Sequence, residues 1–221
     1  MKIILIASIV LFGIKATAQE GTLILKARKM MAGGTTVSKI LQDPQFDSIR
    51  PETDFRQLIR ENSTTGTLTI VTENEPGVKI RIRGKMVNAQ NVPLSNKLVY
   101  IYQTDTRGWY GSDRGHFQMN EGDRRHARIF GYLKTDETGS FEFNTIQPHG
   151  YPQSDLPAHI HFEVFNTNNS AEKITELLFE DDERLKGETK TRSENEGFYI
   201  AAPTTKGNKK TYSYTIIVGG H

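Results

Sequence analysis

The spacing of hydrophobic positions along the chain changes at about Gly66. Before that point, within residues 36–62, apolar residues recur with the i, i+3, i+4 spacing that marks one face of a helix. The positions that do so are Val37, Ile40 and Leu41, followed by Phe55, Leu58 and Ile59. This pattern predicts two short helices, with Pro51 in the first turn of the second one, where a missing backbone N–H is tolerated.

After Gly66 the chain consists of short runs of β-branched and aromatic residues that are separated by turn residues. These runs occupy residues 67–72, 78–87, 97–105, 127–146, 158–165 and 211–218. Several short strands with turn signals between them are typical of an antiparallel sandwich or barrel. We therefore predict a mainly β fold, with an antiparallel β-sandwich core over residues 76–221 and a short, partly helical N-terminal extension over residues 19–75.

Two other segments have less regular patterns. Residues 20–35 are mixed in composition and run into "MMAGGTT", which predicts a flexible lead-in to the first helix. Residues 180–197 are rich in charged residues, and we expect them to form a solvated surface loop rather than a binding patch.

The run from Ala158 to Phe165, "AHIHFEVF", alternates polar and apolar residues with period two. In a strand this alternation places His159, His161 and Glu163 on one face, and the apolar residues between them on the other. Histidine is the commonest protein ligand for metals, and two imidazoles on one strand face can converge on a single ion. The spacing therefore predicts a metal site at this strand.

The first residues, "MKIILIASIVLFGIKATAQE", have the features of a secretory signal peptide: Lys2, a short apolar run, and Ala16-Thr17-Ala18 as a cleavage site. The apolar run is shorter than the roughly 20 residues that span a bilayer. We expect removal of residues 1–18, export to the periplasm or medium, and no membrane insertion.

Cleavage would leave 221 − 18 = 203 residues and remove two lysines, so the formal net charge would fall from +2 to 28 − 2 − 26 = 0. A neutral chain lacks the basic surface that nucleic acids attract, so we expect no nucleic-acid partner. The chain has no cysteine, which excludes disulfides and thiolate metal sites. Any metal must be held by His, Tyr, Asp or Glu.

Three further segments make the chemistry more specific. The sequence contains "YIYQTDTRGWY", "TDETGSFEFNTIQPHGYP" and "PAHIHFEVF" in this order. This series resembles the intradiol ring-cleavage dioxygenases, and the resemblance covers about residues 78–218, with "ITELLFEDD" as a further strand. It implies a β-sandwich with a mononuclear, non-haem Fe(3+) ion.

The resemblance also implies the ligands and the reaction. Tyr110 and Tyr151 would be the phenolate ligands of the iron, and His159 and His161 the imidazole ligands. A nearby cation lowers the pKa of a coordinating group, so a tyrosine can bind iron as phenolate at neutral pH. The implied substrates are a catechol-type molecule and O2, the product is a muconate-type dicarboxylic acid, and homo-oligomerisation is left open. Tyr151 would leave the axial position and act as the catalytic base, while His159 keeps the other axial position.

The chain departs from the family pattern at three positions. Leu156 stands where an arginine is common, Tyr102 stands where a tryptophan is expected, and Tyr132 stands where another arginine is common. The candidates for replacing the arginine at position 156 are Arg107, Arg114 and Arg128.

Two other classes of protein stay open from the sequence. One is a non-catalytic, exported binding module with a prealbumin-like sandwich, which "GKMVNAQNVPLSNKLVYIY" also resembles. The other is a cupin-like metal site that uses His159, His161 and Glu163 as a two-histidine, one-carboxylate set.

Overall fold

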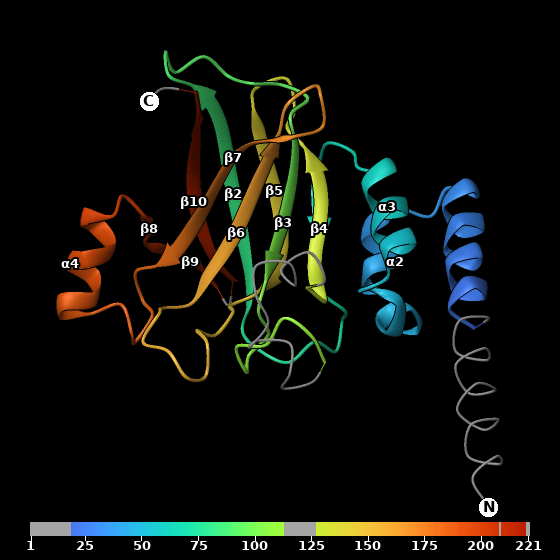
Figure 1. Ribbon diagram of the computed structural model, residues 1–221, viewed down its shortest axis with the longest axis horizontal. Coiled ribbons are helices and arrows are strands. Elements are labelled where there is room, and N and C mark those ends of the chain that lie inside the picture. Colours follow the sequence, from blue (N-terminus) through green and yellow to red (C-terminus); the bar gives the residue numbers. More distant parts are fainter. Residues whose placement is uncertain (1–18, 113–126, 208, 220–221) are drawn as a thin grey trace, which may run out of the picture.

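The computed structural model describes residues 19–112, 127–207 and 209–219, and two β-sheets form its centre (Figure 1). The first sheet has the order β1-β5-β2-β10-β9 and the second has the order β4-β3-β6-β7-β8. The first sheet contains β1 (Thr67–Thr69), β5 (Ser140–Ile146), β2 (Lys79–Asn88), β10 (Lys209–Val218) and β9 (Pro203–Lys206). The second contains β4 (Ile129–Lys134), β3 (Leu98–Gln103), β6 (His159–Phe165), β7 (Ala171–Phe179) and β8 (Tyr199–Ala201).

The two sheets pack face to face through aromatic side chains. The ring centroid of Phe162 on β6 lies 6.1 Å from those of both Phe141 and Phe143 on β5, and 5.1 Å from that of Tyr214 on β10. Such pairs bury large apolar areas between two layers. The predicted β-sandwich is therefore confirmed.

The sheets are mixed rather than purely antiparallel. β1 runs parallel to β5, β10 parallel to β2, and β8 parallel to β7, whereas the remaining pairs are antiparallel. The parallel β10–β2 pair arises because β10, which forms a hairpin with β9 along one edge, lies beside the much earlier strand β2 along its other edge. Hydrophobic runs identify strands, but they do not fix the neighbour or direction of each strand.

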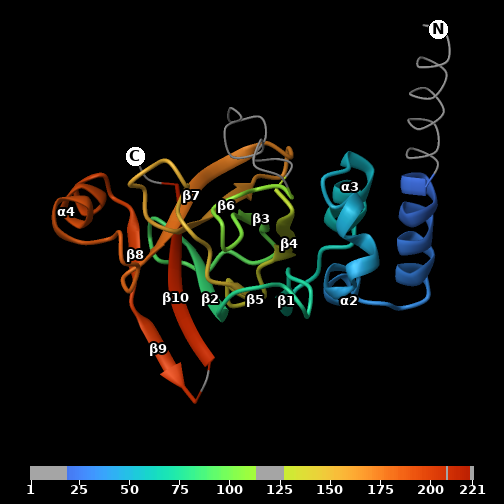
Figure 2. The ribbon, with the colours of Figure 1, turned by 90° about the horizontal axis from the view of Figure 1, so that it is seen from below.

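Helices before the sandwich cover the β4 side of the second sheet (Figures 1 and 2). They are α2 (Val37–Gln42), the 3-10 helix η1 (Pro44–Ile49) and α3 (Thr53–Glu61). The two predicted helical pieces therefore form, and their apolar residues join the same buried cluster as the sandwich residues. The expected flexible lead-in is wrong, because residues 19–32 form a helix in which Leu23, Ile24, Met30 and Met31 pack against that cluster.

The charged segment 180–197 also differs from the expected loop. It contains α4 (Gly187–Asn195), which lies beside β8 on the side of the sandwich away from α2 and α3 (Figure 1). Only Ser193 of this helix is buried, so its sequence shows no apolar stripe from which a helix could be predicted. None of the helices in the described ranges is both long and apolar enough to cross a bilayer.

Candidate metal centre

His159 and His161 lie on the face of β6 that is turned away from the first sheet. Ile160, Phe162 and Val164 point the other way, into the core between the sheets, and are fully buried. β6 is the central strand of its sheet. Its outward face is also covered, since the two histidines on it are only 8% and 2% exposed. Buried imidazoles need polar partners.

Those partners are two tyrosines from separate loops. The hydroxyl oxygen of Tyr110 lies 2.6 Å from that of Tyr151 and 2.8 Å from Nε2 of His161. The hydroxyl oxygen of Tyr151 lies 3.2 Å from Nε2 of His159. The structure thus brings together all four residues that the sequence predicted as iron ligands, with their donor atoms facing one another.

The second nitrogen of each imidazole is held by a different partner. Nδ1 of His159 lies 2.8 Å from the carbonyl oxygen of Pro157, which can only accept a hydrogen bond, so Nδ1 donates and Nε2 presents its lone pair. Nδ1 of His161 lies 2.9 Å from a carboxylate oxygen of Glu176 on β7. Such partners orient a metal-binding imidazole and fix its tautomer.

Glu176 was not predicted from the sequence. It lies directly across from His161 in the β6–β7 register, and its carboxylate and the two histidines have potential ligand atoms within 4.8 Å of one another. Because the carboxylate approaches Nδ1 of His161, while both Nε2 atoms face the tyrosines, its place is behind the imidazole. The cupin-like set predicted Glu163, but the structure places Glu176 beside the histidines instead. The only sequence signal for Glu176 is a charged residue inside the apolar run "ITELLF".

The loop that carries Tyr110 is folded around the carboxylate of Asp105. This carboxylate accepts hydrogen bonds from the backbone N–H of Arg107 at 2.8 Å and from that of Trp109 at 3.1 Å. It also pairs with the Arg107 guanidinium at 2.6 Å, and that guanidinium lies 4.0 Å from the centre of the Trp109 ring. An Asp side chain that binds backbone two residues ahead forms an Asx turn, which explains why the chain reverses before Tyr110.

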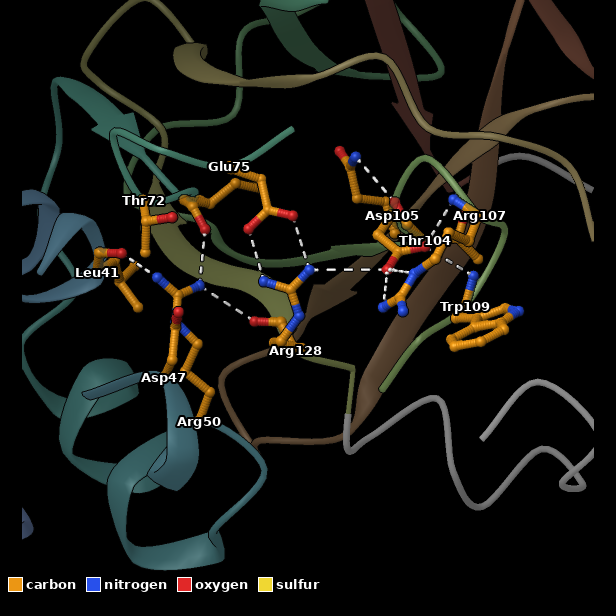
Figure 3. Close-up of polar contacts among 12 residues, drawn as sticks. Leu41, Asp47, Arg50, Thr72, Glu75, Thr104, Asp105, Arg107, Trp109 and Arg128 are labelled. Carbon is orange, nitrogen blue, oxygen red and sulfur yellow. Dashed lines mark hydrogen bonds and ion pairs between the residues drawn. The ribbon is translucent and has the colours of Figure 1, made fainter. Parts of the chain in front are cut away.

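A buried network of charged side chains fixes the same loop from the other side (Figure 3). The guanidinium of Arg128 donates to both carboxylate oxygens of Glu75, at 2.6 and 2.7 Å, and lies 3.8 Å from Asp105. The backbone N–H of Arg128 donates to the carbonyl of Tyr110 at 2.7 Å. Its own carbonyl accepts from Arg50, which is fully buried and follows η1. The N-terminal helices are thereby connected to the backbone of Tyr110.

The two tyrosine loops touch at a pair of glycines. Gly108 has a φ of +79°, and a Cβ built on it would lie 2.4 Å from the carbonyl oxygen of Gly150. A Cβ on Gly150 would lie 2.2 Å from the carbonyl oxygen of Leu156. Gly108 is therefore required both by its left-handed backbone and by the close approach, whereas Gly150 is required by space.

A row of stacked aromatic rings leads across the sheet to His161. Tyr132 stacks on Tyr100 at 4.7 Å, Tyr100 on Tyr102 at 4.9 Å, and Tyr102 on the imidazole of His161 at 4.5 Å with ring planes 10° apart. Tyr102 and Tyr132, two of the departures from the family pattern, thus form part of the packing that holds His161 flat.

Burial strongly affects the protonation of Tyr110. Desolvation, followed by the nearby Tyr151 hydroxyl, raises the pKa of Tyr110 well above its usual range. With protein groups alone around it, Tyr110 is a neutral phenol. A metal cation among the four donor atoms would reverse this, because its charge favours the phenolate.

A pocket of about 270 Å³ is lined by three of the four donor residues, Tyr151, His159 and His161. The lining also includes Leu156, together with Arg192, Ser193 and Phe198 from α4 and the segment after it. The charged segment expected to be only a solvated surface therefore forms part of the pocket wall. The volume of the pocket is close to the lower end of the range for small-molecule sites.

The sequence analysis proposed three arginines that could replace the arginine common in the family at position 156, where this chain has a leucine. The structure pairs Arg107 with Asp105 and Arg128 with Glu75, and neither lines the pocket. Arg114 lies outside the described residues. The pocket is instead lined by Arg192, which the sequence analysis did not consider.

Comparisons against known proteins agree with the fold. The sequence model of a family described as Dioxygenase matches residues 54–218, and the matches to individual proteins are to intradiol enzymes. The chain therefore belongs to the intradiol dioxygenase family. The match begins inside α3, earlier than residue 78, where the resemblance of the sequence motifs begins.

Individual relatives are distant. The chain is 28% identical over 131 residues to the protocatechuate 3,4-dioxygenase beta chain of Burkholderia cepacia, covering 54% of this chain and 52% of that protein. It is 26% identical over 121 residues to catechol 1,2-dioxygenase 1 of Acinetobacter lwoffii, covering 48% and 37% respectively. The match thus spans about half or less of the length of these relatives.

Solved structures show the same fold at low identity. An intradiol ring-cleavage dioxygenase from Tetranychus urticae aligns with a TM-score of 0.52 and 19% identity, over 72% of this chain and 88% of that chain. The dioxygenase domain of a carbohydrate-binding fusion protein from Streptomyces sp. SirexAA-E aligns with a TM-score of 0.51 and 21% identity, over 72% and 90%.

Proposed function

We propose that this protein is a non-haem Fe(3+) dioxygenase that cleaves a catechol-type ring between its two hydroxylated carbons with O2, giving a muconate-type dicarboxylic acid. The observation that carries this proposal is the convergence of two tyrosine oxygens and two histidine nitrogens over distances of 2.6 to 3.2 Å. Family membership supports the same class of reaction.

The donor set fits ferric iron. Two tyrosine oxygens, once deprotonated, are hard anionic ligands, and imidazole is a common ligand for iron. Tyr110, Tyr151, His159 and His161 would hold the ion, with Glu176 and the Pro157 carbonyl orienting the two imidazoles. When bound, the ferric ion would draw electron density from a catecholate ring so that O2 can attack it.

The side chains around the donor atoms would have different roles in the reaction. Tyr151 lines the pocket and is partly exposed, so its hydroxyl oxygen can meet an incoming catechol and accept one of its protons as a general base. Tyr110 is only 5% exposed and remains in place. The pocket walls, including Leu156 and Phe198, would bind the ring and exclude water from it.

The test combines metal analysis with turnover. We expect one iron per chain, a burgundy colour from tyrosinate-to-iron charge transfer, and loss of iron in a His159→Ala/His161→Ala double variant. Catechol, protocatechuate and hydroxyquinol are then offered with ¹⁸O2, and we expect one of them to yield a ring-opened acid that carries both labelled atoms. Binding of zinc alone, or no ring opening by iron-loaded protein with any of the three, would contradict the proposal.

A further inference from the structure

The loop from Gly150 to Ala158 is held in place by residues 182–184, just beyond β7. This loop carries Tyr151 at one end and delivers the chain into His159 at the other. It contains no helix or strand, so its shape depends on contacts with the rest of the protein. Those contacts come from residues 182–184, between β7 and α4.

One guanidinium nitrogen of Arg184 binds the inside of the loop. Its Nη1 donates to the carbonyl of Tyr151 at 2.9 Å, to that of Ser154 at 3.1 Å, and approaches that of Leu156 at 3.5 Å. In the described part of the chain, no carboxylate lies within ion-pairing distance of this guanidinium. Nη1 of Arg184 therefore hydrogen-bonds to the backbone of the loop instead of forming an ion pair, and in this way it holds the loop in position.

The neighbouring Asp182 fixes the far end of the loop. One of its carboxylate oxygens accepts from the backbone N–H of Ala158 at 2.9 Å, directly before His159, and the other accepts from the backbone N–H of Arg184 at 2.7 Å. Hydrogen bonds to a charged group are among the stronger ones in proteins. The two ends of the loop are thus attached to a single short segment.

The sequence of the loop is adapted to this contact. A Cβ on Gly150 would lie 2.7 Å from Nη1 of Arg184, so a larger residue there would displace the guanidinium. The chain continues from Arg184 into α4, which contributes Arg192 and Ser193 to the lining of the pocket that Tyr151 also lines. Residues 182–184 therefore connect the loop that carries Tyr151 to α4.

We propose that Arg184 is a positioning residue that holds the backbone of Tyr151 in place, so that the Tyr151 hydroxyl meets Tyr110 and His159 while only its side chain moves. This inference rests on the proposed function for its catalytic consequence. Its structural consequence, an ordered loop, is independent of iron.

The experiment compares Arg184→Met and Arg184→Lys with Arg83→Met, a control on an exposed arginine of β2 whose side chain is 60% exposed. In metal-free protein, amide hydrogen exchange over residues 151–158 should accelerate at least about tenfold in Arg184→Met and remain unchanged in Arg83→Met. Exchange in the core strand β6 should stay the same in both variants, which shows that each is folded. Unchanged exchange in the loop of Arg184→Met would overturn the proposal whether or not the protein binds iron.

The catalytic arm uses the iron-loaded proteins. Misplacement of a catalytic group by about 1 Å typically costs about 10² in rate, so kcat per iron should fall by that order in Arg184→Met, with a smaller change in KM. The tyrosinate charge-transfer band should shift, and Arg184→Lys should restore part of both, because an ammonium can still donate to these carbonyls. A loosened loop with an unchanged band and unchanged kcat would contradict the positioning role. Absence of iron and activity in the parent protein would instead contradict the proposed function.

Discussion

Glu176 binds the imidazole of His161 at the nitrogen that does not face the tyrosines. A carboxylate oxygen of Glu176 lies 2.9 Å from Nδ1 of His161, while Nε2 lies 2.8 Å from the Tyr110 hydroxyl oxygen. The strand register explains this contact, because Glu176 on β7 is paired directly with His161 on β6. A carboxylate in this position favours a proton on Nδ1 and would make Nε2 a stronger donor to a metal.

Replacing this carboxylate should weaken metal binding. In Glu176→Gln we expect iron affinity to fall by about 10- to 100-fold, because the amide retains the shape of the side chain but loses its charge. Competition with a chelator measures the change. The matched control is Glu163→Gln, on the same face of β6, which should keep the parent affinity. If Glu163→Gln lost iron instead, the cupin-like ligand set would be favoured.

The glycine contact between the two tyrosine loops gives a second prediction. Gly108→Ala should destabilise the fold by more than the roughly 1–2 kcal/mol that a left-handed backbone costs, because the new Cβ also meets the Gly150 carbonyl. Gly34→Ala is the control, since Gly34 has a φ of +91° but no atom within 4 Å of the added Cβ. Urea denaturation compares the two. Equal losses would show that the contact between the loops has no energetic weight.

The buried pair beneath the Tyr110 loop should matter for stability. Glu75 and Arg128 have side chains that are 4% and 14% exposed, so Glu75→Gln leaves the guanidinium with only the longer, 3.8 Å contact to Asp105. Removing one member of a buried ion pair typically costs about 3–5 kcal/mol. The exposed pair of Lys190 and Glu180 provides the comparison, and Lys190→Gln should cost less than about 1 kcal/mol. A Glu75→Gln variant as stable as Lys190→Gln would contradict this assignment.

Much of the fold could be predicted because the apolar pattern is strong where the core is. The alternation around His159 identified β6, and the i, i+3, i+4 spacing identified α2 and α3. The parallel pairing of β10 with β2 could not be predicted, because it depends on which strands meet after the chain has closed. Helix α4 was missed since it buries only Ser193 and has almost no apolar face.

The candidate site also has a part that the sequence predicts and a part that it does not. Tyr110, Tyr151, His159 and His161 belong to local motifs, so their sequence was sufficient to select them. The groups that hold them come from distant parts of the chain. Glu176 is reached across a strand pair, the Tyr151 loop is bound by Arg184, and the Tyr110 loop is bound through Arg128. Apart from the charged residue inside "ITELLF", these contacts have no local sequence signal.

Export is a prediction about residues that lie outside the described part of the chain. We propose that residues 1–18 are removed after Ala18, because Lys2, the apolar run and the A-x-A site match a secretory signal peptide. N-terminal sequencing of the protein from the periplasmic and secreted fractions should begin at Gln19. An intact Met1 in a cytosolic fraction would contradict it.

The two tyrosines should behave differently when each is changed to phenylalanine. Tyr151 lines the pocket, whereas Tyr110 is only 5% exposed and hydrogen-bonds both Tyr151 and His161. We expect Tyr151→Phe to keep substantial iron but to cleave catechol about 10²- to 10⁴-fold more slowly, the usual cost of losing a general base. Tyr110→Phe should instead bind iron weakly, with an altered colour and easier reduction.

Single-turnover cleavage, normalised to the iron content of each variant, separates these effects. A Tyr199→Phe variant serves as the control, since that tyrosine is 39% exposed, lies on β8 and packs against Tyr214. It should match the parent in iron content and rate. A rate per iron near the parent value in Tyr151→Phe would show that this hydroxyl does not accept the proton. The base would then have to be sought among the other groups that line the pocket, such as Glu176 and Glu196.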